Sequence, residues 1–375
     1  MMIFFIAIIL TSISPALPRL AEDFSLNYTD MGLLFTFESI GFVVFTFFSG
    51  IIADRIGKKK TIMLFLIMLV VSIFLWAFSP NYTFLYAVIL FMGGGIGIVE
   101  TLSNALLSDL SDENEIAYQL NIMQCFFGFG AIAGPILIGL AFSYGVSWRT
   151  VYQVLGVAFV VMTIWFFMNK FPQLPAAEKI VLRDLKALVV DAKFLLICLC
   201  MLLYTGSEVG AWGWMAEFTE SVMNFSVAES GAAVAAFWAS MTVTRLILAA
   251  HLHRINLIKL IIWLSLASGA VSALMGIADS KAFMWLMVVL LGAACSAIWP
   301  NVLAYGAEIY KKNSGTVFAM LIASGGAGNT IIPGLMGLSG ERFGLRWSLA
   351  IPAVFFALIA VLFVIIPRLK SRMQS

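Results

Sequence analysis

Long apolar runs separated by short polar segments dominate the chain from Met1 to Pro367. Each run has about 17 to 25 residues, the length that an α-helix needs to cross roughly 30 Å of hydrocarbon. The runs lack the alternation of barrel strands, and lipid offers backbone amides no partners, so helices are the expected spans. We predict twelve spans, near residues 2–18, 30–53, 61–79, 83–108, 118–143, 149–169, 194–216, 228–252, 257–277, 282–307, 315–339 and 346–367.

The composition agrees with a membrane protein. Of the 375 residues, 62% are hydrophobic and 11% are charged. The mean hydropathy is +1.02, so the chain has more apolar surface than one soluble core could bury. We interpret the first run as a span rather than a cleaved signal peptide, because no charged segment precedes it. The cysteines lie within predicted helices without metal-ligand spacing and are expected to be core residues; they are Cys125, Cys198, Cys200 and Cys295.

The distribution of basic residues predicts the orientation. With the N-terminus inside, sixteen Lys and Arg residues lie in cytoplasmic segments and five lie on the opposite side. This asymmetry satisfies the positive-inside rule. The acidic loop SDLSDENE (108–115) also lies inside in this arrangement, but acidic residues contribute little to the rule. We therefore expect a multi-pass protein of a bacterial-type inner membrane with both termini in the cytoplasm.

The two halves of the chain resemble each other at a nearly constant offset. Asn104 corresponds to Asn301 at 197 residues, GPILIG (134–139) to IPGLMG (332–337) at 198, and GVSW (145–148) to GLRW (344–347) at 199. Ordered matches of this kind indicate an internal duplication. We predict an N-terminal six-helix bundle (1–169), a cytoplasmic linker (170–193) and a C-terminal six-helix bundle (194–375), the layout of transporters that rock two bundles about a central site.

A charged loop between the second and third spans carries a family motif. GIIADRIGKKK (50–60) resembles the loop signature of the major facilitator superfamily, with Gly50, Asp54, Arg55, Gly57 and Lys58 in matching positions. The second-half copy, RLILAAHLHRI (245–255), is degenerate. The resemblance covers nearly the whole chain and implies an all-α membrane protein with the fold of that superfamily.

The same loop is a candidate gate. Gly50 would let two helices approach closely, and Asp54 near a helix end can pair with basic groups or with a helix N-terminus. Contacts that exist in one of two conformations act as a switch. We expect the gating set to include Arg55, Gly57 and Lys58, with Arg245 as a conformational latch; the alternative is a loop that only anchors the inner interface by positive charge.

Three glutamates interrupt apolar spans and are candidate ion-coupling residues. They are Glu38, Glu100 and Glu208. A carboxylate in hydrocarbon is costly, so each is expected to face a cavity, a partner or a proton. Glu38 is only eight residues past Asp30, which predicts a position near the outer surface within reach of water. A structural hydrogen-bonding role is the alternative for all three.

Polar and aromatic residues near these acids predict a solute site. Tyr204, Glu208 and Trp212 recur at intervals of four and share one side of a helix. Amides, carboxylates and flat rings suit a polyhydroxylated ligand. The other candidate residues are Asn104, Gln124, Trp299, Asn301 and Asn329. The amides could instead join helices, and the tryptophans could be packing or, for Trp214 above all, interfacial anchors.

The seventh-span stretch YTGSEVGAWGW (204–214) is similar to the corresponding helix of the fucose-proton symporter group and its sodium-linked glucose relatives. GGGIGIVETLSNALL (93–107) also resembles that group, with Glu100 as the acidic residue and GGGIG allowing close backbone approach. The chain departs from the group in having no acidic residue in its first predicted span. The resemblance implies symport of a sugar by alternating access.

We therefore expect a secondary active transporter that couples a sugar or similar small polar solute to a cation, with a proton favoured over sodium. The alternative is a proton-coupled multidrug antiporter, suggested by GAIAGPILIG (130–139). An enzyme is not expected, because the two histidines are near one loop and no nucleotide-binding loop is present. The expected partners are the solute and the bilayer, with no cofactor beyond H+ or Na+, no nucleic acid and a monomeric chain.

Overall fold

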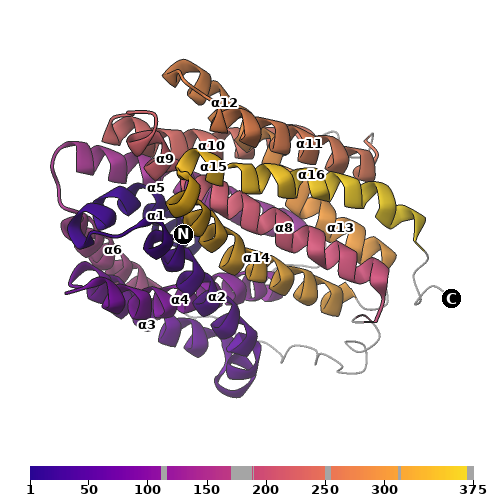
Figure 1. Cartoon of the computed structure of the whole chain (residues 1–375). Helices are drawn as coiled ribbons and strands as arrows, with labels where there is room; N and C mark the ends of the chain where they lie inside the picture. Colours follow the sequence, from indigo (N-terminus) through magenta and orange to yellow (C-terminus); the bar gives the residue numbers. More distant parts are fainter. Residues whose placement is uncertain (111–115, 170–187, 189, 250–254, 311–313, 370–375) are drawn as a thin grey trace. The chain divides into compact units, whose positions relative to one another are not determined.

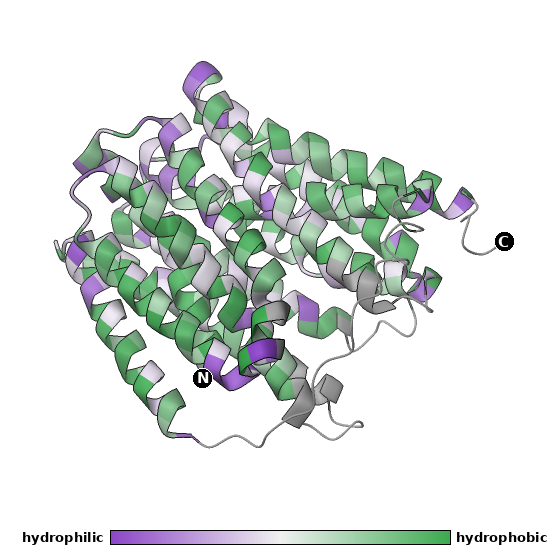
Figure 2. Cartoon of the chain, turned by 90° about the horizontal axis from the view of Figure 1, so that it is seen from below, coloured by the Kyte–Doolittle hydropathy of each residue, from purple (hydrophilic) through white to green (hydrophobic). Residues whose placement is uncertain are grey.

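The computed structural model describes residues 1–110, 116–169, 188, 190–249, 255–310 and 314–369. Within these ranges, 12 helical segments are long and apolar enough to cross a membrane, and the regular structure is helical without strands. The predicted all-α fold with twelve spans is thus confirmed. Figure 2 shows how apolar residues dominate the helices.

Contacts divide the chain into two compact units. Unit 1 comprises Met1–Ala177 and Met215–Ala235, and unit 2 comprises Glu178–Trp214 and Ala236–Ser375. Unit 1 therefore includes a segment that the sequence places in the C-terminal bundle (194–375). The predicted linker, 170–193, lies mostly outside the described residues. The division into bundles at these boundaries stays a prediction.

Unit 1 contains the first six spans, one short helix and the start of another span (Figure 1). Within it, α2 packs on α4, α1 on α5, α3 on α4 and α6, and α9 on α1. Its helices are α1 (Met2–Phe24), α2 (Tyr28–Ile56), α3 (Lys58–Ala77), α4 (Tyr82–Leu110), α5 (Ile116–Ser143), α6 (Trp148–Met168), α9 (Met215–Ser221) and the first part of α10 (Val227–Ala249).

Unit 2 contains the seventh span, the rest of α10 and the last four spans. Within it, α14 packs on α8, and α11 packs on α16 and α12. Its other helices are α8 (Ala192–Gly213), α11 (Leu257–Gly276), α12 (Lys281–Cys295), α13 (Ile298–Ile309), α14 (Ser314–Phe343), α15 (Leu345–Ser348) and α16 (Ala350–Ile365), followed by the 3₁₀ turn η3 (Ile366–Arg368).

Several spans differ from their predicted extents. The first helix continues to Phe24 although Pro15 and Pro18 lie inside it. The seventh span ends at Gly213, and α9 follows as a separate helix. The tenth and twelfth spans are each built from two consecutive helices, α12 with α13 and α15 with α16. Hydrophobic length predicts a span but carries no information on breaks within it.

Side-chain caps begin many of the helices. Asn27 accepts a hydrogen bond from the Asp30 backbone at 2.8 Å, and the Asp30 carboxylate accepts one from the Asn27 backbone, which forms a capping box. Asp191, Asn256 and Ser280 cap α8, α11 and α12 in the same way with one side-chain acceptor. These caps satisfy the first amides of each helix and so determine where the turns lie.

Two glycines each allow a close helix crossing. A Cβ on Gly93 of α4 would lie 2.1 Å from the backbone oxygen of Glu38 on α2. A Cβ on Gly328 of α14 would lie 2.0 Å from the backbone oxygen of Leu202 on α8. Any larger residue would push the backbones apart at these points. The close approach predicted for GGGIG is therefore observed at its first glycine.

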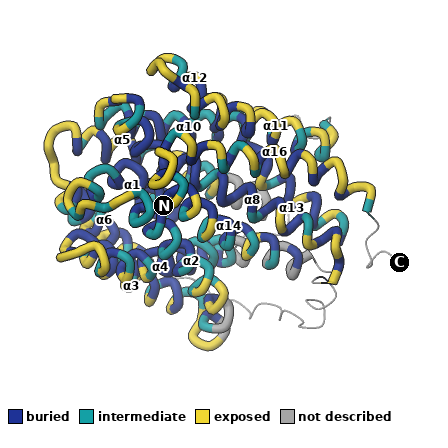
Figure 3. The backbone as a smooth tube through the Cα atoms, in the orientation of Figure 1, coloured by how far each residue is buried: buried dark blue, intermediate teal, exposed yellow. Residues whose placement is uncertain are grey.

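Many helical residues are exposed (Figure 3), and large apolar ones are among them. Phe47 of α2, Val154 of α6 and Trp263 of α11 are 74%, 64% and 69% exposed. In water such surfaces would be unfavourable, whereas lipid solvates them well. The exposed apolar faces thus agree with spans that contact the bilayer.

Candidate substrate and ion-coupling site

A break in the tenth span is the centre of the polar site in unit 2. α12 ends at Cys295 and α13 begins at Ile298. Pro300 has no backbone N–H, and its ring would clash with the carbonyl four residues earlier, which is that of Ser296. Pro300 thus removes one helical hydrogen bond at this point, and where α12 ends its last carbonyls need other donors.

Side chains of two other helices supply those donors. The Tyr204 hydroxyl, on α8, donates to the Cys295 carbonyl oxygen at 2.7 Å. The Arg245 Nε, on α10, donates to the Ser296 carbonyl oxygen at 2.8 Å. Tyr204 is fully buried, so its hydroxyl has no competing water at the surface. The geometry of the break thus depends on α8 and α10.

Glu208 joins the same arrangement. It lies one turn beyond Tyr204 on the same side of α8. Its carboxyl group lies close enough to the Tyr204 hydroxyl and to Arg245 to interact electrostatically with both. Among the described residues, no carboxylate oxygen lies within 4.0 Å of the Arg245 guanidinium. We call Tyr204, Glu208, Arg245, Cys295 and Ser296 the break cluster.

The tryptophans beyond Glu208 are buried. Trp212 is 3% exposed, and its ring centroid lies 5.8 Å from that of Trp238. Trp214 is completely buried and donates its indole N–H to the Pro333 carbonyl at 3.2 Å. The expectation that Trp214 is an interfacial anchor is therefore wrong: its indole bonds to α14 inside unit 2.

Two amides of unit 2 have a buried polar atom without a partner among the described residues. Asn301 is 3% exposed, and its Nδ2 has no hydrogen-bond acceptor within the described residues. The Oδ1 of Asn329 also has no donor there. Trp299, at the start of α13, is partly exposed. Buried polar atoms normally find partners, so both amides can bond a ligand hydroxyl.

Glu38 lies in the interior of unit 1. Its side chain is 6% exposed, and its Oε1 has no hydrogen-bond partner within the described residues. Tyr152 is close enough to interact electrostatically with it, and the Tyr152 and Ser12 hydroxyls are 2.9 Å apart. The predicted position near water at the outer surface is thus wrong, because α2 packs this residue against α4 at Gly93.

The remaining candidates of unit 1 show less organisation. Glu100 is half-buried on α4. The Asn104 amide, one turn later, donates to the Glu100 backbone oxygen at 2.9 Å, so this bond stays within its own helix. Gln124 of α5 is exposed. These three residues belong to unit 1 and the other six solute candidates to unit 2, and the structure describes each set within its own unit.

The sequence profile of the Major Facilitator Superfamily matches residues 1–286 and 259–374 of the chain. The chain belongs to the major facilitator superfamily. The resemblance read from GIIADRIGKKK (50–60) is thereby confirmed. Members of this superfamily are membrane transporters rather than enzymes.

Relatives of this superfamily member are distant in sequence. The protein TsgA homolog of Buchnera aphidicola subsp. Baizongia pistaciae (strain Bp) is 25% identical over 359 residues, which are 95% of this chain and 90% of the relative. The E. coli fucose:proton symporter FucP has a similar fold, with a TM-score of 0.66, 17% identity and coverage of 97% of this chain and 96% of FucP. The nucleoside transporter NupG superposes with a TM-score of 0.82, 14% identity and 97% coverage of both chains. Because their sequence identities to this chain are below 25%, these two solved structures show only that this chain has the same fold.

The superfamily loop turns at a glycine. Gly57 ends α2 and precedes α3 with φ +90, a conformation that favours glycine. Arg55 is exposed and Lys58 is half-buried. The surroundings of Gly50 and of the Asp54 side chain are not among those that the structure describes. The gating role of this superfamily loop, and its latch with Arg245, therefore stay predictions.

A second polar cluster in unit 1 was missed by sequence reasoning. Arg19 of α1 forms an ion pair with Glu220 of α9, and the Ser230 hydroxyl donates to the same carboxylate at 2.7 Å. Burial raises the pKa of Glu220, while Ser230 and Arg19 oppose the rise. Burial also raises the pKa of Glu217 to about 7. The paired residues are 201 positions apart, so no local pattern could have linked them.

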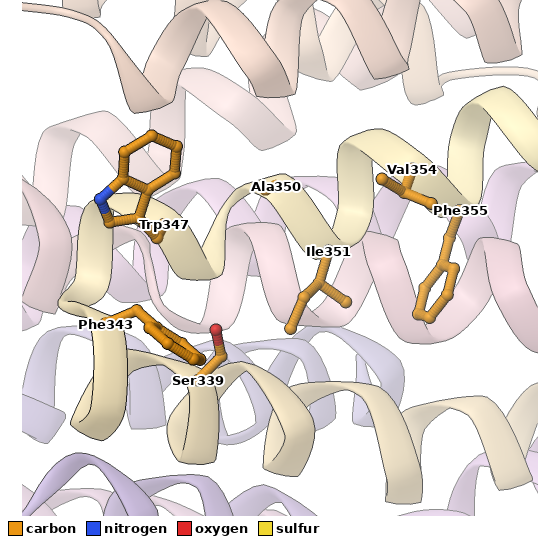
Figure 4. Close-up of a pocket in the computed structure, with 7 residues that line it drawn as sticks. All are labelled: Ser339, Phe343, Trp347, Ala350, Ile351, Val354 and Phe355. Atoms are coloured by element: carbon orange, nitrogen blue, oxygen red, sulfur yellow. The ribbon is translucent and has the colours of Figure 1, made fainter.

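A cavity of about 510 Å³ in unit 2 contains none of the predicted site residues (Figure 4). Its lining is apolar apart from the Ser339 hydroxyl and the Trp347 indole nitrogen. The lining residues are Ser339 and Phe343 of α14, Trp347 of α15, and Ala350, Ile351, Val354 and Phe355 of α16. A cavity with so few polar groups does not match the hydroxylated ligand predicted above.

Proposed function

We propose that this transporter is a proton-coupled symporter of a sugar or similar small hydroxylated solute. The observation that carries the proposal is the break cluster: an acid, a tyrosine and an arginine meet at a discontinuous helix within the membrane. Discontinuous helices are the places where many transporters bind substrates and coupling ions. Glu208 is the acid of the cluster and is proposed to carry the coupling proton.

The Tyr204 hydroxyl supports a proton rather than sodium as the coupling ion. It has a single proton, which it donates to the Cys295 carbonyl. While it does so, it has no second proton to donate to the neighbouring Glu208, so a hydrogen bond between the two groups must then be donated by a protonated carboxyl. Loss of that proton would redirect the hydroxyl toward Glu208 and release the Cys295 carbonyl. Proton binding would thus change the hydrogen bonding of the helix break.

Unpartnered amides support a hydroxylated solute. Asn301 and Asn329 offer a donor and an acceptor inside unit 2. The similarity in fold to a fucose:proton symporter is compatible with this class of solute. We propose that Trp212 and Trp299 border the solute and that Asn104, Glu100, Gln124 and Glu38 serve from the other unit during alternating access.

The setting of the transporter is also proposed. The basic residues favour a bacterial-type inner membrane with both termini in the cytoplasm. The chain is proposed to act as a monomer whose only inorganic requirement is the coupling ion. Its partners are then the solute and the surrounding lipid.

The decisive test is uptake into proteoliposomes under an imposed proton or sodium gradient, with panels of sugars and of cationic drugs. We expect proton-driven accumulation of at least one hydroxylated solute. Glu208→Gln should abolish accumulation against a gradient, because the amide cannot exchange a proton. Glu308→Gln is the matched control: this exposed glutamate of α13 lies outside the break cluster, so accumulation should be unchanged.

Two results would count against the proposal. Full concentrative uptake by Glu208→Gln would remove Glu208 from coupling. Proton-driven movement of cationic drugs without uptake of any hydroxylated solute would favour the multidrug antiporter. The stretch GAIAGPILIG (130–139), which suggested the antiporter, also has a packing role in unit 1. A Cβ on Gly130 would lie 2.2 Å from the Phe4 carbonyl oxygen, so glycine at this position permits close packing of α5 on α1.

A further inference from the structure

Arg245 is a permanent positive charge in a membrane-spanning helix, and its compensation is incomplete. A guanidinium does not lose its proton in a protein. Its Nε bonds the Ser296 carbonyl, and its Nη2 contacts Met241 Sδ at 3.4 Å, which is a weak acceptor. Within the described part of the chain, the acid that acts on it is Glu208, and the two form no ion pair with an N···O distance of 4.0 Å or less. Among the described residues, the guanidinium therefore keeps N–H donors without a charged acceptor.

The charge of this pair depends on the proton. With Glu208 ionised, the carboxylate balances Arg245 across the gap. With Glu208 protonated, the positive charge of Arg245 is left uncompensated inside the membrane, which is unfavourable. A neutral solute would not restore the balance. An anionic group on the solute would, and a carboxylate can bond a guanidinium through two parallel N–H···O bonds.

We propose that the transported solute carries a carboxylate, which binds Arg245 when Glu208 is protonated. This inference rests on the proposed function, since it takes Glu208 as the coupling acid and names the class of solute. The proton and the anion then each bind better in the presence of the other, which is the reciprocal linkage that symport requires. One proton moves with one anion, so the step carries no net charge.

Other groups around Glu208 do not supply a second cation. On its own helix the titratable neighbour is Tyr204, and on α12 it is the Cys295 thiol. α14 meets α8 through Gly328, beside Gly206, and through Met336, beside Gly210. α16 places Phe356 against Tyr204, with ring centroids 6.2 Å apart. With a single guanidinium, the described site matches a monocarboxylate better than a dianion such as phosphate.

Binding to the purified full-length protein tests the inference without relying on transport. The probes are matched pairs: D-glucuronate with D-glucose, D-galacturonate with D-galactose, and D-glycerate with glycerol. At least one acid should bind more than about tenfold tighter than its uncharged counterpart, and tighter at about pH 6 than at about pH 8. Glu208→Gln, which mimics the protonated acid, should tighten acid binding and remove its pH dependence. Arg245→Gln should weaken it at least about tenfold, with partial recovery in Arg245→Lys.

The outcomes separate this inference from the proposed function. Equal binding of acid and uncharged counterpart, no binding of any acid, or acid binding unaffected by Arg245→Gln would overturn it, even if proton-driven uptake of a neutral sugar is found. Acid binding that requires Arg245 supports it, even if no proton-driven uptake is found and the symport proposal fails. If Arg245→Gln does not fold, two other variants decide the question. Arg245→Lys should bind the acid more weakly than the wild type, and Glu208→Gln should bind it more tightly.

Discussion

The acidic side chains Glu208, Glu38 and Glu220 differ in the groups that surround their carboxyl groups. Glu208 lies near a tyrosine hydroxyl and interacts electrostatically with an arginine. Glu38 is buried with one carboxylate oxygen unpartnered within the described residues. Glu220 forms an ion pair with Arg19. Sequence alone identified the two acids inside long apolar runs, but it overlooked Glu220 because the short helix α9 has the composition of an ordinary polar turn.

Glu217 gives the α9 segment a dependence on pH. Burial raises its pKa from 4.5 to about 7. Between pH 4.5 and about pH 7, the carboxyl group is therefore protonated in the folded state and ionised in the unfolded chain. Its contribution to stability is therefore largest below pH 4.5 and declines as the pH rises to about 7, by at most about 3 kcal/mol. We expect backbone hydrogen exchange in α9 to be faster at pH 8 than at pH 5 after correction for intrinsic rates.

Glu217→Gln should make the protection of α9 nearly independent of pH, because the amide does not titrate. Asp279→Asn is the matched control, since its side chain is 91% exposed and it lies in unit 2. An unchanged pH dependence in Glu217→Gln would show that another group controls the segment.

Among the helices, hydrophobic length predicted every span, whereas the interruptions were not predicted. Pro300 was visible in the sequence, but a proline in an apolar run can kink a helix without breaking it. What identifies a true break is the capture of the Ser296 and Cys295 carbonyls by Arg245 and Tyr204, which are 51 and 91 residues away in sequence. Tertiary partners at such separations leave no local pattern, so the break cluster could be predicted only in part, through Tyr204 and Glu208.

Joining α12 to α13 should impair transport. Pro300→Ala restores an N–H that can bond the Ser296 carbonyl, so Arg245 would lose its acceptor. We expect uptake to fall at least about tenfold while the helix becomes more stable, by up to about 3 kcal/mol. Pro352→Ala is the matched control, because Pro352 is likewise the third residue of its helix but lies outside the break cluster. Uptake and thermal unfolding measure the two effects, and wild-type uptake by Pro300→Ala would show that the break is dispensable.

For the molecule as a whole, the sequence predicted the superfamily and the number of spans, because hydrophobic runs and the GIIADRIGKKK loop depend on local residues. The assignment of Met215–Ala235 to unit 1 was not foreseen. It follows from contacts of α9 with α1, including the Ser14 hydroxyl accepting from the Ala216 N–H at 3.4 Å. Such contacts arise between segments that the chain order separates.

The orientation of the whole chain can be tested by labelling with a membrane-impermeant maleimide. Tyr144, in the turn after α5, is 83% exposed and is expected outside, whereas Lys60 at the start of α3 is exposed and expected inside. Tyr144→Cys should react in intact cells, and Lys60→Cys only after permeabilisation. The reverse pattern would invert the proposed topology. The native cysteines lie in helices, so the unmodified chain provides the background signal.

The position of Trp299 has a practical consequence. This indole adjoins Pro300 at the break and is 37% exposed, while Trp76, Trp212 and Trp214 are almost completely enclosed. Tryptophan emission shifts with the polarity around the ring, so movement at this point would alter the fluorescence of the unlabelled protein. The transporter therefore has a native tryptophan where the tenth span is interrupted, and its signal adds to that of the more exposed Trp165, Trp263 and Trp347.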